Sequence, residues 1–292
     1  MKIIILGSVS FTKEIIKSLI KKNIYIDGII GKKYSKFNSD YSDVVKFFKK
    51  ETDVLYSKDV NDKKTYNWIK NKKPDLIVCL GWSHIIGPKI LKLPKIGIIG
   101  YHPSNLPSNK GRHPIIWSIV LGLKQTASTF FLMNSEVDGG KIISKKLIKI
   151  KKYYSSMDLY KKLYKVAGIQ LCEILNKLKN GKLRVVKQKK INENYWRKRK
   201  FEDGQMDWRM NAENILRLIK GLGKPYLGAH FMFNKKEVKI WRAKVIKSKK
   251  INLEPGKIIN IKNSHPIIKC GKNSLMLLEY TPKIKLKLDS YL

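Results

Sequence analysis

The chain has 292 residues, of which 43% are hydrophobic, and its 62 basic and 22 acidic side chains give a formal net charge of +40. This length can bury a sizeable core and predicts two domains, while no apolar run reaches the roughly 18 residues of a membrane span. Cys79, Cys172 and Cys270 lack the spacing of a metal site or of a disulfide framework, so we expect a cytoplasmic protein without a metal.

The positive charge is carried almost entirely by lysine. Only 7 of the 62 basic residues are arginine, and the lysines are spread along the whole chain beside abundant isoleucine and asparagine. Arginine is the side chain that usually forks onto phosphates and bases. This pattern favours a coding bias at solvated positions over a nucleic-acid footprint, and an anionic small-molecule substrate agrees with the charge equally well.

In the first half, segments typical of strands alternate with segments typical of helices. Residues 1–11 indicate a buried first strand rather than a signal peptide. Strands are predicted at residues 2–6, 24–30, 75–80, 96–99, 126–133 and 142–150, and helices at 11–21, 63–70, 115–121 and 155–179. This alternation predicts an α/β fold with a doubly wound, mostly parallel sheet, whose functional loops follow the carboxyl ends of the strands.

The second half has a different pattern. Residues 185–203 are polar and basic and suggest a linker, which gives a catalytic domain at 1–184 and a second domain at 204–292. A helix is expected at 212–221, a Gly/Pro turn at 223–228, and short strands at 237–241, 256–261, 267–269 and 275–279. The second domain is therefore predicted to be small and β-rich, similar to an OB-like, partly open barrel.

Residues 97–117 and 136–142 carry the most informative pattern. An apolar strand leads to His102, which stands at a turn containing Pro103 and Pro107, and Asp138 precedes two glycines. A histidine at a strand end could simply be satisfied by the backbone, and an aspartate before two glycines could be an ordinary turn residue. Together, however, they are the pair that acyl-transfer chemistry needs: an imidazole to handle a proton and a carboxylate to orient it.

The segment 101–141 resembles the signature of the formyltransferases that use 10-formyltetrahydrofolate. That family includes enzymes acting on methionyl-tRNA, on glycinamide ribonucleotide and on sugar nucleotides. The matching positions are His102, Ser104, Leu106, Pro107, Lys110, Gly111, Pro114, Trp117, Asp138 and Gly140. Residues 1–11, 206–231 and 255–259 also resemble the family's first strand and second domain, so the resemblance covers nearly the whole chain.

Two positions depart from the family pattern. The family's asparagine, which helps to hold the formyl oxygen as it becomes an oxyanion, falls on Gly100. Loss of one such donor can cost on the order of 10²–10³ in rate. The family's arginine falls on Lys110, which keeps the positive charge but lacks the bidentate hydrogen bonding of a guanidinium group. Around Gly100 the sequence resembles the hydrolase domain of formyltetrahydrofolate dehydrogenase, where this position is also not asparagine.

The resemblance implies direct formyl transfer to a primary amine, with 10-formyltetrahydrofolate as co-substrate. His102 would polarise the oxyanion or take the amine proton, and Asp138 would accept a proton and fix the imidazole. Ser104 and Lys110 would lie near the substrate. The folate pocket is expected along two loops, at Leu80, Gly81, Trp82, His84, Ile85, Met133, Asn134, Ser135, Glu136 and Val137. Trp82 and Ile85 could equally be core residues, and His84 could be the first residue of a helix.

The acceptor amine is the least determined part of the interpretation. The tRNA enzymes carry a basic insertion after the second strand. Here the matching segment, residues 31–48, is short, includes Asp40 and Asp43, and contains no arginine. Residues 81–83, 195–208 and 224–230 resemble the sugar-nucleotide enzymes more closely. We therefore expect a nucleotide-activated amino sugar, with Arg197, Lys220 and Lys224 on its diphosphate and Trp196 or Tyr226 on its base. Methionyl-tRNA formylation, formyltetrahydrofolate hydrolysis and a homodimeric state stay open.

Overall fold

The computed structural model describes residues 1–35, 38–189, 191–248 and 251–292. The chain divides into two compact units. The first comprises Met1–Pro114, Gln125–Lys149 and Tyr160–Arg197, and the second comprises Ile115–Lys124, Ile150–Leu159 and Lys198–Leu292. Each unit has its own buried core, so each is described separately.

The first unit is built on a seven-stranded sheet in the order β3-β2-β1-β4-β5-β7-β8. The neighbours among β3, β2, β1, β4 and β5 are parallel, whereas β7 pairs antiparallel with both of its neighbours, β5 and β8. Central strands are continuous apolar runs because both of their faces are covered. The bounds are β1 Ile3–Leu6, β2 Gly28–Gly31, β3 Val54–Tyr56, β4 Leu76–Cys79, β5 Gly97–His102, β7 Gln125–Leu132 and β8 Ile142–Lys149.

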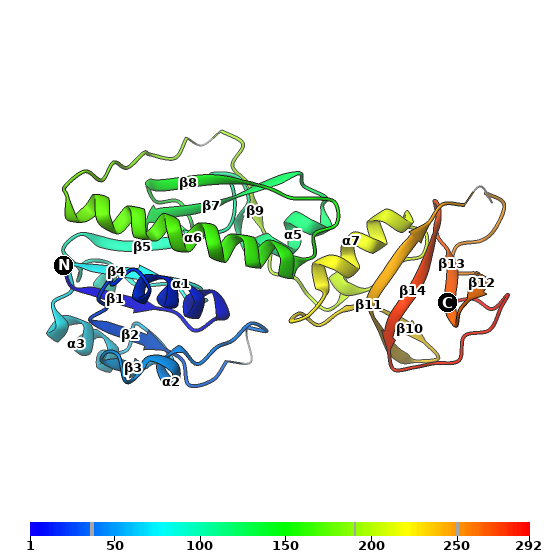
Figure 1. Cartoon of the computed structure of the whole chain (residues 1–292), viewed down its shortest axis with the longest axis horizontal. Coiled ribbons are helices and arrows are strands. Elements are labelled where there is room, and N and C mark those ends of the chain that lie inside the picture. The colour runs from blue at the N-terminus through cyan, green and yellow to red at the C-terminus, as the bar shows by residue number, and fades with distance from the viewer. Residues whose placement is uncertain (36–37, 190, 249–250) are drawn as a thin grey trace. The chain divides into compact units, whose positions relative to one another are not determined.

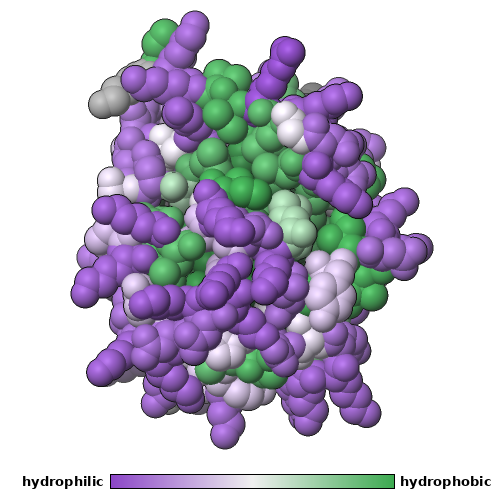
Figure 2. Space-filling view, turned by 90° about the vertical axis from the view of Figure 1, so that its left-hand side faces the viewer, coloured by the Kyte–Doolittle hydropathy of each residue, from purple (hydrophilic) through white to green (hydrophobic). Residues whose placement is uncertain are grey.

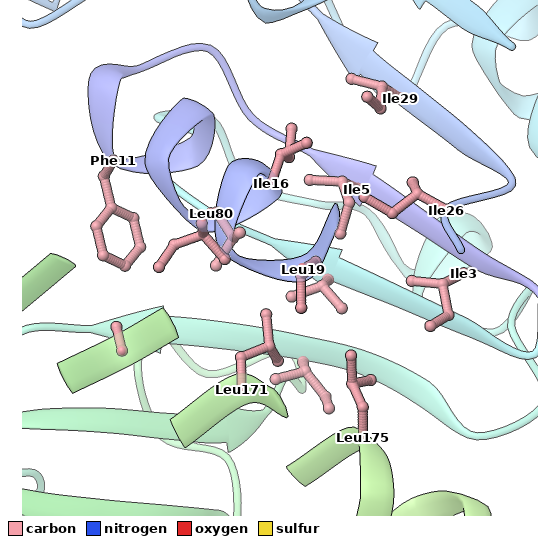
Figure 3. Close-up of a cluster of buried hydrophobic side chains, with 14 of the residues drawn as sticks. Ile3, Ile5, Phe11, Ile16, Leu19, Ile26, Ile29, Leu80, Leu171 and Leu175 are labelled. Carbon is pink, nitrogen blue, oxygen red and sulfur yellow. The ribbon is translucent and has the colours of Figure 1, made fainter. Parts of the chain in front are cut away.

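Helices cover both faces of this sheet, as expected for a doubly wound fold (Figure 1). On one face, α1 (Ser10–Ile20) and α6 (Ser156–Lys179) share a core with β1 and β5, which Figure 3 shows through side chains such as Leu19 and Leu171. On the other face, α3 (Lys63–Lys72) and α4 (Pro88–Leu91) contribute Ile69 and Ile90 to a second cluster. The predicted mostly parallel α/β sheet is therefore confirmed.

Several short elements were not predicted. These are α2 (Val44–Phe48), β3, α4 and β10 (Ala229–Phe233), while residues 24–27, expected to be strand, precede the observed start of β2 at Gly28. The segment 185–197, expected to be linker, contains β9 (Tyr195–Trp196), which pairs with β6 (Lys110–Gly111). Because β6 directly follows the turn after His102, this pairing ties the segment to the candidate site.

The second unit contains a five-stranded antiparallel sheet in the order β10-β11-β14-β13-β12. The helix α7 (Ala212–Leu222) packs against this sheet with Ile215, Leu218 and Ile219, and α5 (Pro114–Val120) adds Ile116 to the same core. The predicted β-rich character of this part is confirmed. The other elements are the 3₁₀ helix η1 (Glu202–Gly204), β11 (Lys236–Ile246), β12 (Ile258–Lys262), β13 (His265–Lys269) and β14 (Ser274–Thr281).

Hydrophilic and apolar side chains share the surface of the chain. Figure 2 shows one face of the molecule, on which hydrophilic side chains lie on every side of an apolar area. Within the described ranges, no helix is long and apolar enough to cross a membrane. The same residues contain no group of three or more His, Cys, Asp or Glu side chains placed to hold a metal ion.

Candidate active site

His102 is the last residue of β5 and is held by the turn that follows it. Its side chain is buried, and its Nε2 lies 2.8 Å from the carbonyl oxygen of Asn109. A carbonyl oxygen only accepts hydrogen bonds, so Nε2 carries the proton in this contact. Nδ1 is then the nitrogen that faces Asp138, with 3.5 Å between Nδ1 and Oδ2 of the carboxylate. The structure thus brings together the imidazole and the carboxylate that the sequence pairs.

Asp138 reaches His102 because the loop after β7 folds back along the sheet. The loop leaves the sheet beside Ile98, whose carbonyl accepts from the amide of Met133 at 2.8 Å. Asp138 adopts the left-handed region (φ 53°), and its Oδ2 accepts the amide N–H of Gly111 at 3.0 Å. A Cβ at Gly140 would lie 1.6 Å from the carbonyl oxygen of Leu132, so only glycine allows this close return of the chain.

Gln188 fastens the same loop from a distant part of the sequence. Its Nε2 donates to the carbonyl oxygens of Asp138, at 2.8 Å, and Gly140, at 2.7 Å. Backbone carbonyls that would otherwise lack a partner are satisfied in this way. The loop that presents Asp138 is therefore held at its side chain by Gly111 and at its backbone by Gln188.

Gly100 faces packed side chains. A Cβ at this position would lie 2.8 Å from Cζ of Phe131 and 2.9 Å from Cγ of Met133, closer than real Cβ atoms approach their neighbours. Phe131 pairs directly with Gly100 across β5 and β7, so both residues point to the same side of the sheet. The space that an asparagine side chain would need is occupied in this chain.

Lys110 is buried, with 1% of its surface exposed. Its Nζ donates to Oε1 of Glu193 at 2.7 Å and to Oε1 of Glu136 at 3.0 Å, and lies 3.4 Å from the hydroxyl of Tyr195. Burial lowers the pKa of Lys110, but the two carboxylates outweigh it and raise the pKa above its ordinary value. Lys110 therefore links the Glu136 loop to the segment that carries β9, and its ammonium group faces these partners rather than solvent.

The loop after β4, at the strand next to β5, carries His84 and contacts the turn after His102. Gly81 has a φ of +69°, and a side chain there would collide with Val9. Arg112 donates to the carbonyl of Ser83 at 3.3 Å, which connects this loop to the turn after His102. His84 Nδ1 lies 2.9 Å from Nζ of Lys32, and burial, followed by the charge of Lys32, lowers the pKa of His84.

The residues expected to contact folate lie on these two loops and differ in exposure. Leu80 is buried, Trp82 is half-buried, and Ile85 is 75% exposed. On the other loop, Met133 is half-buried beneath Gly100, and Val137 is 51% exposed. The remaining predicted residues there are exposed, and Oδ1 of Asn134 accepts the amide of Glu136 at 3.1 Å; they are Asn134, Ser135 and Glu136.

The predicted substrate residues are divided between the two units. Ser104 is buried and donates to the carbonyl of Ser108 at 2.9 Å, and Arg197 is the last residue of the first unit. Lys220, Lys224 and Tyr226 belong to the second unit. There, Nζ of Lys220 donates to the carbonyl of Lys152 at 3.2 Å, and Nζ of Lys224 lies 5.5 Å from the ring centre of Trp241.

Sequence reasoning did not find Asn109, Arg112, Gln188, Glu193 or Lys32 near this site. Arg112 could have been noticed, since it is one of seven arginines and follows the Lys110–Gly111 pair directly. Gln188 lies 48 to 50 residues from the carbonyls it contacts, and Glu193 lies 83 residues from Lys110, so no local pattern marks these contacts. The pairing of β6 with β9 brings Glu193 next to Lys110.

Comparison with known proteins agrees with this architecture over almost the whole chain. Residues 1–175 match the family described as Formyl transferase, and residues 198–292 match Formyl transferase, C-terminal domain. The chain therefore belongs to the formyl transferase family, and it is a formyltransferase.

Two relatives illustrate the range of the family. The bifunctional polymyxin resistance protein ArnA of Wigglesworthia glossinidia brevipalpis is 35% identical over 247 residues, which are 81% of this chain and 36% of that protein. The chain thus spans about a third of this relative's length. The methionyl-tRNA formyltransferase of Caldanaerobacter subterraneus subsp. tengcongensis is 37% identical over 211 residues, 72% of this chain and 67% of that enzyme.

A solved structure shows the same fold in a small enzyme. WlaRD, a sugar 3N-formyl transferase crystallised in the presence of dTDP and 5-N-formyl-THF, superposes with a TM-score of 0.72. The alignment covers 97% of this chain and 99% of WlaRD, at 17% sequence identity. The likeness extends over both units of the chain, each taken by itself.

Proposed function

We propose that this formyltransferase moves a formyl group from 10-formyltetrahydrofolate to the primary amine of a nucleotide-activated amino sugar. The observation that carries the proposal is the His102–Asp138 pair, 3.5 Å apart at the carboxyl end of β5. In parallel α/β sheets this is the edge at which ligands bind. An imidazole fixed by a carbonyl on one nitrogen and facing a carboxylate with the other suits proton handling in acyl transfer.

The proposed roles follow from the hydrogen bonds of the two side chains. The donor supplies the formyl carbonyl. The amine loses a proton as its bond to the formyl carbon forms, and N10 of tetrahydrofolate takes a proton as the bond from the formyl carbon to N10 breaks. A proton received at Nδ1 of His102 lies beside the Asp138 carboxylate, which stabilises the imidazolium. Gly111 keeps that carboxylate in place through its amide N–H. Since Gly100 offers no side-chain donor, the developing oxyanion would be stabilised in this proposal by the positive charge of the His102 imidazolium.

The two loops beside His102 suit a flat ring with polar edges. Ile85 and Val137 are exposed apolar side chains that a bound ring would cover. The indole Nε1 of Trp82 is buried and has no hydrogen-bond partner among the residues that the structure describes. A buried donor without a partner is costly, so a ligand acceptor at this loop would be stabilising. These features support the folate assignment of residues 80–85 and 133–137.

The sugar-nucleotide assignment is supported by the loop after β2 and by WlaRD. The described residues of this loop contain no arginine, Tyr41 donates to the carbonyls of Lys32 and Lys33, and Asp43 caps α2. Tyr41 and Asp43 are thus engaged by backbone groups of this loop and of the helix that follows it. WlaRD, which matches this chain over nearly its full length, is a sugar N-formyl transferase.

Methionyl-tRNA is the second candidate acceptor. The relative from Caldanaerobacter carries that name, and a net charge of +40 would attract a polyanion. Hydrolysis of the donor is a third candidate, because Gly100 removes the side chain that the transferases use. Release of formate without any amine acceptor would favour this third activity.

His102→Asn tests the proposed site. We expect the substitution to lower the rate of formyl transfer by about 10³-fold, in the range typical of general acid–base groups. His265→Asn in β13 is the matched control and should keep the parent rate. The assay follows tetrahydrofolate release with and without amine, and circular dichroism verifies the fold. Activity of the His102 variant within a few-fold of the parent would exclude this histidine from the chemistry.

A further inference from the structure

A cavity within the second unit is lined by more cationic side chains than carboxylates. It has a volume of about 400 Å³ and lies between the end of α5 with its following turn, residues 150–154, and α7. This volume falls in the range of small-molecule sites. Five cationic side chains and one carboxylate line it: Lys124, Lys151, Lys152, Arg217, Lys220 and Glu213.

The cations at this cavity lack the ion pairs that would balance them. Within residues 1–35, 38–189, 191–248 and 251–292, none of the five is within ion-pair distance of a carboxylate. The single carboxylate, Glu213, accepts from Nδ2 of Asn273 at 2.7 Å. Burial lowers the pKa of Lys220, against the opposing effect of the Asp158 carboxylate. A bound anion would offset this cost.

Arg217 is fixed in the wall of the cavity. Its Nε donates to the carbonyl of Val120 at 3.2 Å, and its Nη2 donates to Oδ1 of Asn214 at 2.6 Å. The guanidinium lies against Gly122, where a Cβ would come within 3.0 Å of Nε and where φ is +69°. An arginine held in this way is preorganised, so little side-chain entropy is lost when it binds a phosphate.

The rest of the lining is apolar and aromatic. Leu123, Ile150 and Leu216 line the cavity together with Tyr154. Apolar groups next to unpaired cations match a ligand that carries phosphate at one end and a planar, weakly polar group at the other. We propose that this cavity is a nucleotide-binding site, with the phosphates on the lysines and Arg217 and the base on the apolar side chains.

Lysine labelling tests the location directly and does not depend on formyl transfer. The intact chain is acetylated under limiting conditions with ADP, UDP, uridine or pyrophosphate, and labelling of each lysine is read by peptide mass spectrometry. We expect ADP or UDP to slow labelling of Lys124, Lys151 and Lys152 several-fold. Lys244 and Lys262, exposed lysines of the same unit outside the cavity, serve as internal controls and should not change.

A pair of double variants adds an affinity test. Lys124→Gln/Lys151→Gln removes two exposed charges at the cavity, and Lys244→Gln/Lys262→Gln removes the same charge elsewhere in the second unit. Calorimetric titration with the protecting nucleotide should show about tenfold weaker binding at the protected site for the first variant only. If both variants weaken binding equally, the attraction comes from net charge alone and the site does not exist.

Each other outcome also decides the question. Absence of protection by either nucleotide at millimolar concentration overturns the proposal, as does equal protection by pyrophosphate, which would leave an anion site without a base. Protection by a short RNA without protection by ADP or UDP would assign the surface to RNA instead. If ADP or UDP protects these lysines but the protein transfers no formyl group to any acceptor, the proposed function is contradicted and the nucleotide site is retained.

Discussion

At the scale of single residues, His102 uses its two ring nitrogens for different partners. Nε2 is held by the carbonyl of Asn109, and Nδ1 faces Asp138. Because these partners come from the turn after β5 and from the loop after β7, the imidazole is oriented from two sides. A strand-end histidine that was merely satisfied by its own turn would need only the first contact.

Gly100 is one of the two positions at which this chain departs from the family pattern. We expect Gly100→Asn to reduce both stability and transfer, because its Cβ would collide with Phe131 and Met133. Overpacking of this kind costs about 1–3 kcal/mol. Chemical denaturation measures the loss in stability, and the transfer assay measures the loss in rate.

The double variant Gly100→Asn/Phe131→Leu supplies the control for this idea. Removal of the ring opens the space that the new side chain needs, so part of the lost stability should return. If Gly100→Asn alone is as stable as the parent and faster, the collision is relieved by small movements. That result would mean that the site still accepts the family's asparagine and that Gly100 only lowers the rate of transfer.

At the scale of elements, an ion network around the buried Lys110 joins three parts of the first unit. Lys110 in β6 contacts Glu136 on the loop after β7, and Glu193 just before β9. A lysine buried to this degree is stable only because two carboxylates surround it. The network holds the proposed folate loop against the paired strands β6 and β9, so Lys110 acts as a positioning residue.

Replacement of Lys110 should therefore be more harmful than replacement of a surface lysine. Lys110→Met removes the ammonium that faces both Glu136 and the half-buried Glu193, and we expect unfolding to require about 3 kcal/mol less. Lys146→Met, which breaks an exposed pair with Glu173, should cost less than about 1 kcal/mol. Equal effects in urea denaturation would contradict a structural role for the network.

The pH dependence of this difference has a definite sign. The pKa of Lys110 is raised in the folded chain, so the folded state binds its proton more tightly than the unfolded state does. The stabilisation is fully present below the ordinary lysine pKa of about 10.4 and is lost as pH rises through the folded value. The gap between the parent and Lys110→Met should stay constant on the alkaline side of neutrality and shrink above about pH 10.4.

The elements also show which parts of the fold can be predicted. Strands buried on both faces, such as Ile3–Leu6 and Leu76–Cys79, are uninterrupted apolar runs and were recognised. Strand β3 and helix α4 have three and four residues. Such elements are too short to show the spacing of apolar residues that is typical of a strand or of a helix. His102 and Asp138 belong to an ordered motif, whereas the role of Gln188 depends on long-range contacts that leave no local signal.

At the scale of the whole molecule, the net charge of +40 is dispersed. The lysines that carry this charge are spread along the whole sequence rather than gathered in one segment. A tRNA-binding enzyme makes many phosphate contacts and loses affinity steeply as salt rises. A sugar nucleotide carries few charges, so its binding should respond only modestly.

We therefore predict a shallow salt dependence for the preferred acceptor. Between 50 and 200 mM salt, a tRNA complex with six or more phosphate contacts would weaken by about 10³-fold or more. For the sugar nucleotide we expect a change of about tenfold or less in KM over the same range, measured by transfer assays at constant pH. A steep loss of activity would favour the tRNA interpretation.

The most direct measurement is mass spectrometry of acceptors incubated with the protein and 10-formyltetrahydrofolate. Nucleotide-linked amino sugars, charged initiator tRNA and a sample without amine are compared side by side, each with the parent and with His102→Asn. We predict that an amino sugar gains the mass of one formyl group with the parent alone. Formylation of tRNA only, or formate released equally with and without amine, would contradict the account.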